Sequence, residues 1–366
     1  MRMHSQAINR RRFLEHLGAT TALTGLSLSC RHTHNDAPSR DVQPIRGSWT
    51  SIWWDDRRHF YWNETCRNFS SEQWKQSVKD AADLGMQYLV LLAIAKGGKA
   101  FYETPLLPKL EMACPDPIKA LLEGGNEYGV KFFISSDWYA EWDHRALHDQ
   151  ERVTRRFQMM EEIAARYGDY RSFYGWYWPN EACITPYFTS EFIAYVNASS
   201  LHGRRLLPKA KTLTAPYGTR LAVNDDKFVR QLDQLDVDII AYQDEVGCLR
   251  MGPHESQVAF ARLRAAHDRV PQRALWADVE TFAWEGPENR QTSPLIPAPF
   301  PRVLDQLKAV SWYVDTILIY QFQGLMNRLG SKAFAGHPES TRLYDDYLAW
   351  LRAHHPKVIR NTSLRR

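Results

Sequence analysis

Short apolar runs alternate with amphipathic segments along most of this chain. Eight of the runs consist mainly of Val, Ile, Leu and aromatic residues, which is typical of parallel strands buried on both faces. They cover residues 47–54, 87–94, 130–136, 172–178, 211–216, 238–243, 273–280 and 316–322. Because a helical segment follows each run, the pattern predicts an α/β fold, a single (β/α)8 TIM barrel over residues 45–355.

Local signals mark where the predicted helices begin and end. Ser70-Ser71-Glu72-Gln73 forms a capping box, and Gly85 ends the helix that follows it. Asp116-Pro117 begins the next helix, which ends at Gly129. We expect the further helices at about 148–167, 189–201, 225–235, 254–269, 301–314 and 340–354. A doubly wound open sheet is the alternative fold, but no glycine-rich phosphate turn follows the first predicted strand.

The connections on the two sides of the predicted strands differ in length. Helix-to-strand connections are short, as at Gly85-Met86 and Gly129. Strand-to-helix connections are long and cover about 55–69, 95–115, 137–147, 281–300 and 323–338. Long loops on one face of a barrel build its binding site, so we expect the functional residues at the C-terminal ends of the strands. The loop 281–300 contains several prolines, which indicate that it is a stiffened flap.

The chain begins with export signals rather than barrel pattern. Arg10-Arg11 and Phe13-Leu14 resemble the twin-arginine export signature, and the apolar stretch 17–28 is too short to span a bilayer. Leu26-Ser27-Leu28-Ser29-Cys30 resembles a lipoprotein cleavage box with Cys30 as the acylated residue. We expect a signal peptide over 1–30, a polar tether over 31–44 and a frayed polar tail over 356–366. The expected location is periplasmic or at the cell surface, with a membrane tether through Cys30.

Charge and cysteine content exclude two classes of function. The formal net charge is +4, and residues 1–30 contribute +3 of it through four arginines and one glutamate, which leaves about +1. So small an excess provides no basic stripe for nucleic acid. The four cysteines after Cys30 contain no CxxC pair, which argues against structural zinc; they are Cys66, Cys114, Cys183 and Cys248. The sequence is compatible with one disulfide among these cysteines and also with buried free thiols.

Two of the predicted strands finish in a carboxylate. The run 172–178 leads into Pro179-Asn180-Glu181, and the run 273–280 ends in Glu280. In a parallel barrel both strand ends belong to the catalytic face. Cleavage of a glycosidic bond needs two carboxyl groups, one to protonate the leaving oxygen and one to attack the anomeric carbon or activate water. Taken singly, each glutamate could equally have a structural role, Glu181 as the start of a loop and Glu280 as a solvated strand end.

Aromatic and polar residues gather near the same strand ends. Sugars present C–H faces that pack on aromatic rings, and 13 tryptophans are many for a chain of this length. We therefore expect a carbohydrate substrate, and we expect Tyr242 to orient the attacking carboxylate. The expected substrate-binding residues, Tyr242 included, are Trp54, Asp55, Trp138, Trp178, Asn180, Tyr242, Gln243, Asp244, Trp284 and Gln321.

These motifs also carry a family resemblance. Trp178-Pro179-Asn180-Glu181 and Glu280 resemble the retaining (β/α)8 glycoside hydrolases, in which Asn-Glu closes strand four and a second Glu closes strand seven. The resemblance implies Glu181 as acid/base, Asn180 as a donor to the sugar 2-hydroxyl and Glu280 as nucleophile. From about 47 to 354 the chain is similar to a bacterial family of exported, glycosidase-like barrels known only as a domain of unknown function. Ala182 departs from the usual Asn-Glu-Pro pattern.

Two other classes of function stay open. A metal-dependent barrel hydrolase or isomerase would use histidines such as His144 and His148, but no strand end carries His-x-His. A non-catalytic carbohydrate-binding lipoprotein would keep the aromatic mouth and lose one strand-end carboxylate. Both carboxylates are present, so we expect an enzyme that needs no metal and no other cofactor.

Overall fold

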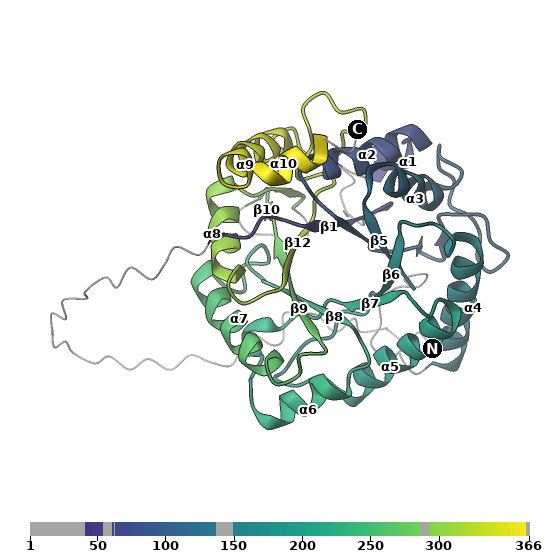
Figure 1. Cartoon of the computed structure of the whole chain (residues 1–366). Coiled ribbons are helices and arrows are strands. Elements are labelled where there is room, and N and C mark those ends of the chain that lie inside the picture. The colour runs from purple at the N-terminus through teal and green to yellow at the C-terminus, as the bar shows by residue number, and fades with distance from the viewer. Residues whose placement is uncertain (1–40, 54–60, 62, 137–148, 287–292, 364–366) are drawn as a thin grey trace, which may run out of the picture. The chain divides into compact units, whose positions relative to one another are not determined.

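A closed barrel of eight parallel strands forms the centre of the fold, and helices surround it (Figure 1). The computed structural model describes residues 41–53, 61, 63–136, 149–286 and 293–363. Around the barrel the strands pair in the order β1 (Gly47–Thr50), β12 (Thr316–Tyr320), β9 (Ala274–Glu280), β8 (Ile239–Gln243), β7 (Lys211–Thr214), β6 (Phe173–Trp178), β5 (Lys131–Ser135) and β2 (Tyr88–Leu91). Each lies within a predicted run, so the predicted (β/α)8 barrel is confirmed.

The helices that cover the barrel also lie where the sequence predicts them. They are α2 (Ser71–Asp83), α3 (Pro117–Tyr128), α4 (Gln150–Tyr167), α5 (Ser190–Leu206), α6 (Asp226–Gln234), α7 (Pro253–His267), α8 (Phe300–Val310) and α9 (Ser340–His354). Among the described residues, three short helical segments were not predicted: α1 (Asn63–Arg67), the 3-10 helix η3 (Thr219–Leu221) and the C-terminal α10 (Pro356–Ser363).

Hydrogen bonds at the helix ends explain why these segments begin and stop there. The Ser70 hydroxyl accepts the Gln73 N–H at 3.3 Å, and the Gln73 side chain accepts the Ser70 N–H at 2.9 Å. Asp116 accepts the Lys119 N–H at 2.9 Å in front of α3. At the other end of α3, Gly129 has a φ of 73°, a left-handed conformation that glycine adopts without steric cost.

Side chains alternate between the barrel lumen and the helix layer. The lumen holds one apolar cluster, formed by Trp49, Val90, Leu92, Phe133, Tyr177, Leu213, Ala215, Ile239, Ala241, Trp276 and Leu318. Intervening strand residues pack outward against the helices in a second, larger cluster. In β9 the residues in phase with Trp276 are therefore the ones that face the lumen, and these include Asp278 and Glu280.

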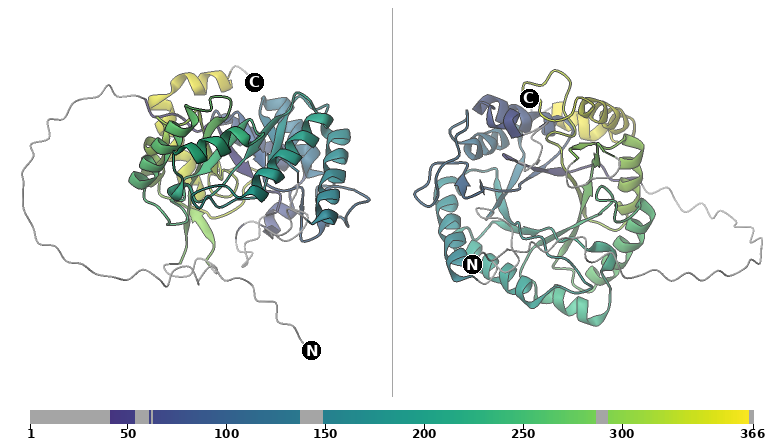
Figure 2. Two further views of the ribbon diagram at one scale, coloured as in Figure 1. Left: turned by 90° about the horizontal axis from the view of Figure 1, so that it is seen from below. Right: turned by 180° about the vertical axis from the view of Figure 1, so that it is seen from behind.

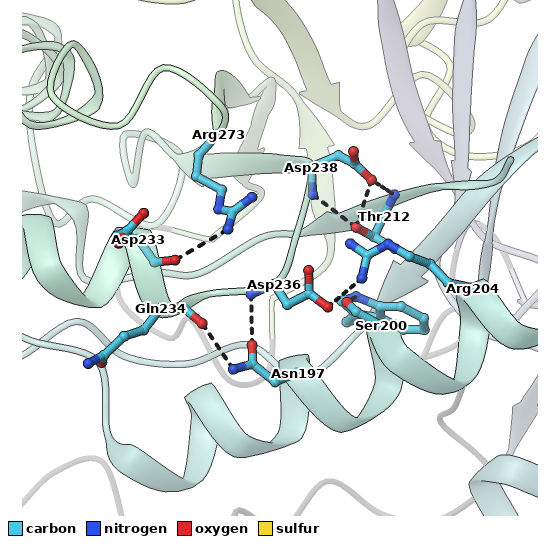
Figure 3. Close-up of polar contacts among 10 residues, drawn as sticks. Asn197, Ser200, Arg204, Thr212, Asp233, Gln234, Asp236, Asp238 and Arg273 are labelled. Carbon is cyan, nitrogen blue, oxygen red and sulfur yellow. Dashed lines mark hydrogen bonds and ion pairs between the residues drawn. The ribbon is translucent and has the colours of Figure 1, made fainter. Parts of the chain in front are cut away.

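A polar network ties the helices to the barrel at the end where the strands begin (Figure 3). Asn197 of α5 donates to the Gln234 carbonyl at 2.9 Å and accepts the Asp236 N–H at 2.7 Å. Thr212 and Asp238 exchange hydrogen bonds of 2.9 Å between β7 and the start of β8. Because this end lies opposite the catalytic face of a barrel, we assign the network to stability.

The chain ends differ from expectation in two places. The tether was expected to reach residue 44, but Gln43 donates its N–H to the Ser311 hydroxyl at 3.0 Å and its side-chain amide to the Val314 carbonyl at 2.8 Å, so the chain is already docked there. Residues 356–363 form α10 rather than a frayed tail, because Val358 and Ile359 pack on the core.

Within the described part of the chain, no helix is long and apolar enough to cross a membrane. The predictions for residues 1–40, including lipidation of Cys30, lie outside the described residues.

The loop after β9 begins and ends as a β-hairpin. β10 (Phe282–Trp284) pairs antiparallel with β11 (Leu295–Pro297), and the light-green pair projects from the barrel in Figure 2. Phe282, Leu295 and Leu325 form a small buried cluster at its base. The described part of the 281–300 loop thus contains a regular antiparallel β-hairpin. A second two-stranded pair, β3 (Ala95–Lys96) and β4 (Lys99–Ala100), follows β2.

Candidate active site

Two carboxyl groups lie at the mouth of the barrel, the end at which the strands finish. β9 ends at Glu280, and β6 ends at Trp178, three residues before Glu181. Since the strands are parallel, both glutamates belong to the same end. Glu280 is buried, with 3% of its surface exposed, whereas Glu181 is only partly buried. One carboxyl group is thus shielded from water and the other is accessible.

The two glutamates share neighbours. Burial raises the pKa of the Asp278 carboxyl well above its ordinary value, and the charges of Glu280 and Glu181 raise it further. Burial also raises the pKa of the Cys248 thiol, to which both glutamates again contribute. Because their charges act on the same two groups, Glu181 and Glu280 border one region of the mouth. A two-carboxylate site requires this arrangement.

Glu280 is held in place by both its side chain and its backbone. The Cys248 N–H donates to Oε2 at 2.6 Å and the Cys248 thiol to Oε1 at 3.2 Å. The Glu280 N–H donates to Asp244 Oδ1 at 3.0 Å. Its carbonyl accepts from Gln306 Nε2 and from Arg302 Nη2, both at 3.0 Å. The position of Glu280 is therefore fixed by the loop after β8 and by α8 together.

Burial and like charge set the ionisation of this carboxyl. Desolvation, and then the charge of Asp244, raise the pKa of Glu280 to about 8, although the two Cys248 donors favour the ionised form. Desolvation also raises the pKa of Asp244 to about 6, against the Glu280 N–H and the Gln306 amide that stabilise its charge. Glu280 thus gains its charge only towards alkaline pH.

A stability prediction follows from this raised pKa. The folded state keeps a proton on Glu280 that the unfolded state releases near pH 4.5, so stability is lost as pH rises from there to about 8. The loss is about 1.4 kcal/mol per pH unit in this window. Glu280→Gln removes the charge, and we expect its advantage over the wild type in free energy of unfolding to grow from pH 5 to pH 8.

Chemical denaturation at a series of pH values measures this difference. The surface variant Glu103→Gln serves as control, because the side chain of Glu103 is 77% exposed. It should keep the pH dependence of the wild type. A constant difference between Glu280→Gln and the wild type across the window would contradict the raised pKa.

Backbone contacts position Glu181 next to the lumen. The segment directly after it forms a bridge with the loop after β7, in which the Ile184 N–H donates to the Tyr217 carbonyl and the Tyr217 N–H to the Ala182 carbonyl, both at 2.9 Å. Burial, and after it the charge of Glu181, raise the pKa of Tyr177 and of Tyr320. Tyr177 belongs to the lumen cluster and Tyr320 packs on it, so Glu181 lies above the lumen.

Asn180 offers an unused hydrogen-bonding atom in the same segment. The residue is 9% exposed, and its buried Oδ1 has no hydrogen-bond partner among the described residues. A buried amide oxygen without a partner costs about 1–3 kcal/mol. The atom is thus available to a ligand hydroxyl beside Glu181.

Two predicted substrate contacts are wrong because the residues face the helices. Trp178 is fully buried, and its indole N–H donates to the Ser200 hydroxyl of α5 at 3.0 Å. Tyr242 is fully buried as well, and its hydroxyl lies 3.0 Å from His267 Nε2 of α7. Neither side chain can reach a ligand at the mouth, and Tyr242 does not orient Glu280.

Two further predicted contacts are wrong because the residues support the site from within. Asp244 is fully buried, and it accepts from Gln306 Nε2 at 2.7 Å in addition to the Glu280 N–H. Gln321 is fully buried between Ser51, whose hydroxyl donates to it at 3.1 Å, and the Gln323 carbonyl, which accepts from it at 3.1 Å. Asp244 is therefore a positioning group for Glu280.

The other predicted contacts divide into two groups. Gln243 and Trp284 are partly buried, and the side-chain amide of Gln243 donates a long hydrogen bond, 3.4 Å, to the Ala215 carbonyl. Trp284 lies on the hairpin, where its ring packs edge-on against Phe282. The remaining members lie outside the described residues, as do the histidines of the metal alternative: Trp54, Asp55, Trp138, His144 and His148.

Sequence reasoning missed Asp278 and Cys248. Asp278 is 3% exposed, and its Oδ1 has no hydrogen-bond partner among the described residues. Strict alternation back from Glu280 would have placed it in the lumen. Cys248 carried no local signal, because its role depends on a contact with β9. The four described cysteines are reduced and form no disulfide with one another. In the ranges that the structure describes, no group of three or more His, Cys, Asp or Glu residues is arranged to hold a metal ion.

Comparisons with known proteins agree with this architecture. Residues 45–333 match the family described as Domain of unknown function (DUF4434). No curated protein matches the sequence. A candidate alpha-L-fucosidase from Bacteroides thetaiotaomicron VPI-5482 is similar in structure, with 16% identity, a TM-score of 0.66 and coverage of 90% of this chain and 99% of that protein.

Two mannanases have the same fold at lower identity. The endo-beta-1,4-mannanase from Thermotoga petrophila has 10% identity and a TM-score of 0.56, covering 87% of this chain and 78% of that one. The endo-1,4-beta-mannanase from Rhizomucor miehei has 9% identity and a TM-score of 0.54, covering 85% and 95%. At such identities the likeness establishes the barrel fold.

Proposed function

The chain belongs to this family of unknown function, and we propose that it is a glycoside hydrolase that cleaves an oligo- or polysaccharide with Glu181 and Glu280. The observation that carries the proposal is the placement of these two carboxyl groups at the ends of β6 and β9, where both raise the pKa of Asp278 and of Cys248. The similar structures named as a candidate fucosidase and as mannanases support the same class of substrate.

The proposed reaction has two steps and retains the anomeric configuration. Glu181 protonates the glycosidic oxygen while the Glu280 carboxylate attacks the anomeric carbon, so that the C–O bond breaks and a glycosyl ester forms. Glu181, now ionised, takes a proton from water, which attacks the anomeric carbon and releases Glu280. The neutral sugar and both starting protonation states are restored.

The surroundings of the two glutamates suit these roles. Glu181 is partly exposed, so a water molecule can reach it for the second step. The Cys248 N–H and thiol hold both oxygens of Glu280, which leaves the carboxylate oriented for attack. The unpartnered Oδ1 of Asn180 can accept a hydrogen bond from a sugar hydroxyl beside the reacting carbon.

A panel of glycans and aryl glycosides tests the proposal. We expect hydrolysis of at least one glycosidic linkage, with products identified by mass spectrometry and anomeric NMR. Binding of an oligosaccharide without turnover would favour the non-catalytic carbohydrate-binding protein instead. Activity that requires an added metal would favour the metal-dependent alternative.

We also propose that the protein works outside the cytoplasm, tethered through Cys30. Arg10-Arg11 with Phe13-Leu14 motivates the export step, and the cleavage box motivates the anchor. Each buried acyl CH₂ contributes about 0.8 kcal/mol to membrane binding, so a terminus with several chains stays attached. Replacing Arg10-Arg11 by Lys-Lys should leave the precursor inside the cell, and Cys30→Ala should free the mature protein or block its maturation. Cell fractionation measures both, and an unchanged membrane fraction for Cys30→Ala would rule out the anchor.

A further inference from the structure

The loop between β8 and α7, residues 244–252, has a constrained backbone directly beside Glu280. Glu245 and Leu249 have φ values of 53° and 56°, a left-handed conformation that costs free energy in residues other than glycine. The Glu245 side chain, 1% exposed, forms an ion pair with Arg250 at 3.0 Å, and its carbonyl accepts the N–H groups of Arg250 and Met251. The loop is therefore pinned in one shape at an energetic cost, as functional loops often are.

Gly247 allows this loop to touch Glu280. A Cβ at position 247 would lie 2.7 Å from the Glu280 Cβ and 3.0 Å from its Oε2. No side chain fits there without displacing Glu280. The close approach brings the following N–H, that of Cys248, within 2.6 Å of the same oxygen.

Cys248 gives Glu280 two donors, one for each carboxylate oxygen. The backbone N–H reaches Oε2, and the thiol reaches Oε1 at 3.2 Å. The thiol acts as a donor only while it is protonated. Burial, followed by the charge of Glu280, raises the thiol pKa far above its ordinary value, so the proton stays on sulfur across the working pH range.

We infer that Cys248 is a positioning residue for Glu280, whose N–H and S–H hold the two carboxylate oxygens in one orientation for attack. The inference deepens the proposed function and rests on it for its effect on turnover. The contact itself also has a consequence that needs no turnover. Donors to a carboxylate favour its charged form, so loss of the thiol should raise the pKa of Glu280 further above its ordinary range.

Three variants test this inference. Cys248→Ala removes the thiol donor and keeps the backbone N–H, Cys248→Ser keeps a hydroxyl donor, and Cys183→Ala is the control for loss of a partly buried thiol elsewhere. Stability falls with pH until Glu280 is fully ionised. Chemical denaturation from pH 5 to 10 should show this fall extending about one pH unit higher in Cys248→Ala. Cys248→Ser and Cys183→Ala should follow the wild type.

Turnover supplies the second readout. The acidic limb of the kcat/KM profile should move up by about one pH unit in Cys248→Ala, a roughly tenfold loss at a fixed pH on that limb, while the alkaline limb, which reports loss of the proton from Glu181, stays in place. Cys248→Ser should restore the wild-type profile. One outcome is that the wild type cleaves no glycoside while the fall of stability with pH still extends higher in Cys248→Ala. In that case the proposed function fails and the Cys248 contact stands. The inference would be overturned if the pH dependence of stability were identical in the wild type and Cys248→Ala. It would also be overturned if Cys248→Ser showed the same shift as Cys248→Ala.

Discussion

Glu280→Gln should lower kcat/KM for a glycoside substrate by more than about 10⁴-fold, the scale seen when a nucleophile is removed from an active site. A neutral amide cannot form the glycosyl ester, yet it has the size of the original side chain. The glutamine oxygen can accept the Cys248 N–H, and its NH₂ can donate to the thiol sulfur. The fold should therefore survive, as thermal unfolding would confirm. Kinetics with an activated aryl glycoside measure the loss.

Two comparisons assign that loss to the missing nucleophile. Glu285→Gln changes a nearby glutamate on the hairpin, whose carboxylate accepts a hydrogen bond from the Tyr61 hydroxyl at 2.6 Å. This variant should retain most of the activity. Glu280→Ala leaves space for azide, which should attack the anomeric carbon and yield a glycosyl azide of inverted configuration. Activity of Glu280→Gln within tenfold of the wild type would show that Glu280 is not the nucleophile.

Glu181→Gln should produce a loss that depends on the leaving group. For a natural glycan the departing oxygen needs a proton, and removal of a general acid costs about 10²–10⁴-fold. An activated aryl leaving group departs without that proton, so the first step should slow by less than about tenfold. Release of the ester then becomes the slow step, because no base activates water, and stopped-flow should show a burst of aryl alcohol.

The pattern of losses distinguishes the roles of the two glutamates. Equal losses on natural and activated substrates would remove Glu181 from the proton-transfer role. If instead the activity loss of Glu280→Gln depended on the leaving group, Glu280 would be the acid and Glu181 the nucleophile. The raised pKa of Glu280, about 8, makes this exchange worth measuring, because an acid also has to hold a proton at working pH.

Much of the fold could be predicted because its signals are local. The apolar runs and the capping residues Ser70 and Asp116 act within a few positions of themselves, and each strand and helix they predicted is present. The C-terminal helix was missed for a physical reason. Its sequence is mostly polar, and it is stabilised by Val358 and Ile359 packing on the core, a contact that the local sequence does not display.

The site could be predicted only in part, because strand register decides which side chains reach the mouth. Trp178 and Tyr242 lie within the last two residues of their strands but point outward to Ser200 and His267. Asp278, two residues before Glu280, points inward instead. Aromatic content near a strand end therefore predicted too many ligand contacts, because it does not say which face of its strand each residue occupies.

The contacts that hold Glu280 were invisible in the sequence for another reason. Cys248 and Gln306 lie 32 and 26 residues from Glu280 along the chain, and neither belongs to a motif. Their role arises only when β8, β9 and α8 come together. Positioning groups of this kind depend on long-range packing and have to be read from the fold.

Trapping the proposed glycosyl ester tests the central claim most directly. A panel of 2-deoxy-2-fluoroglycosides with activated leaving groups slows both steps, and the second more than the first, so a two-step enzyme accumulates the ester. Intact mass and peptide mapping by mass spectrometry then locate the sugar. We predict one added sugar on the peptide that carries Glu280, and none in Glu280→Gln. Hydrolysis of natural glycans with no label on Glu280, or with the label on another residue, would contradict the account.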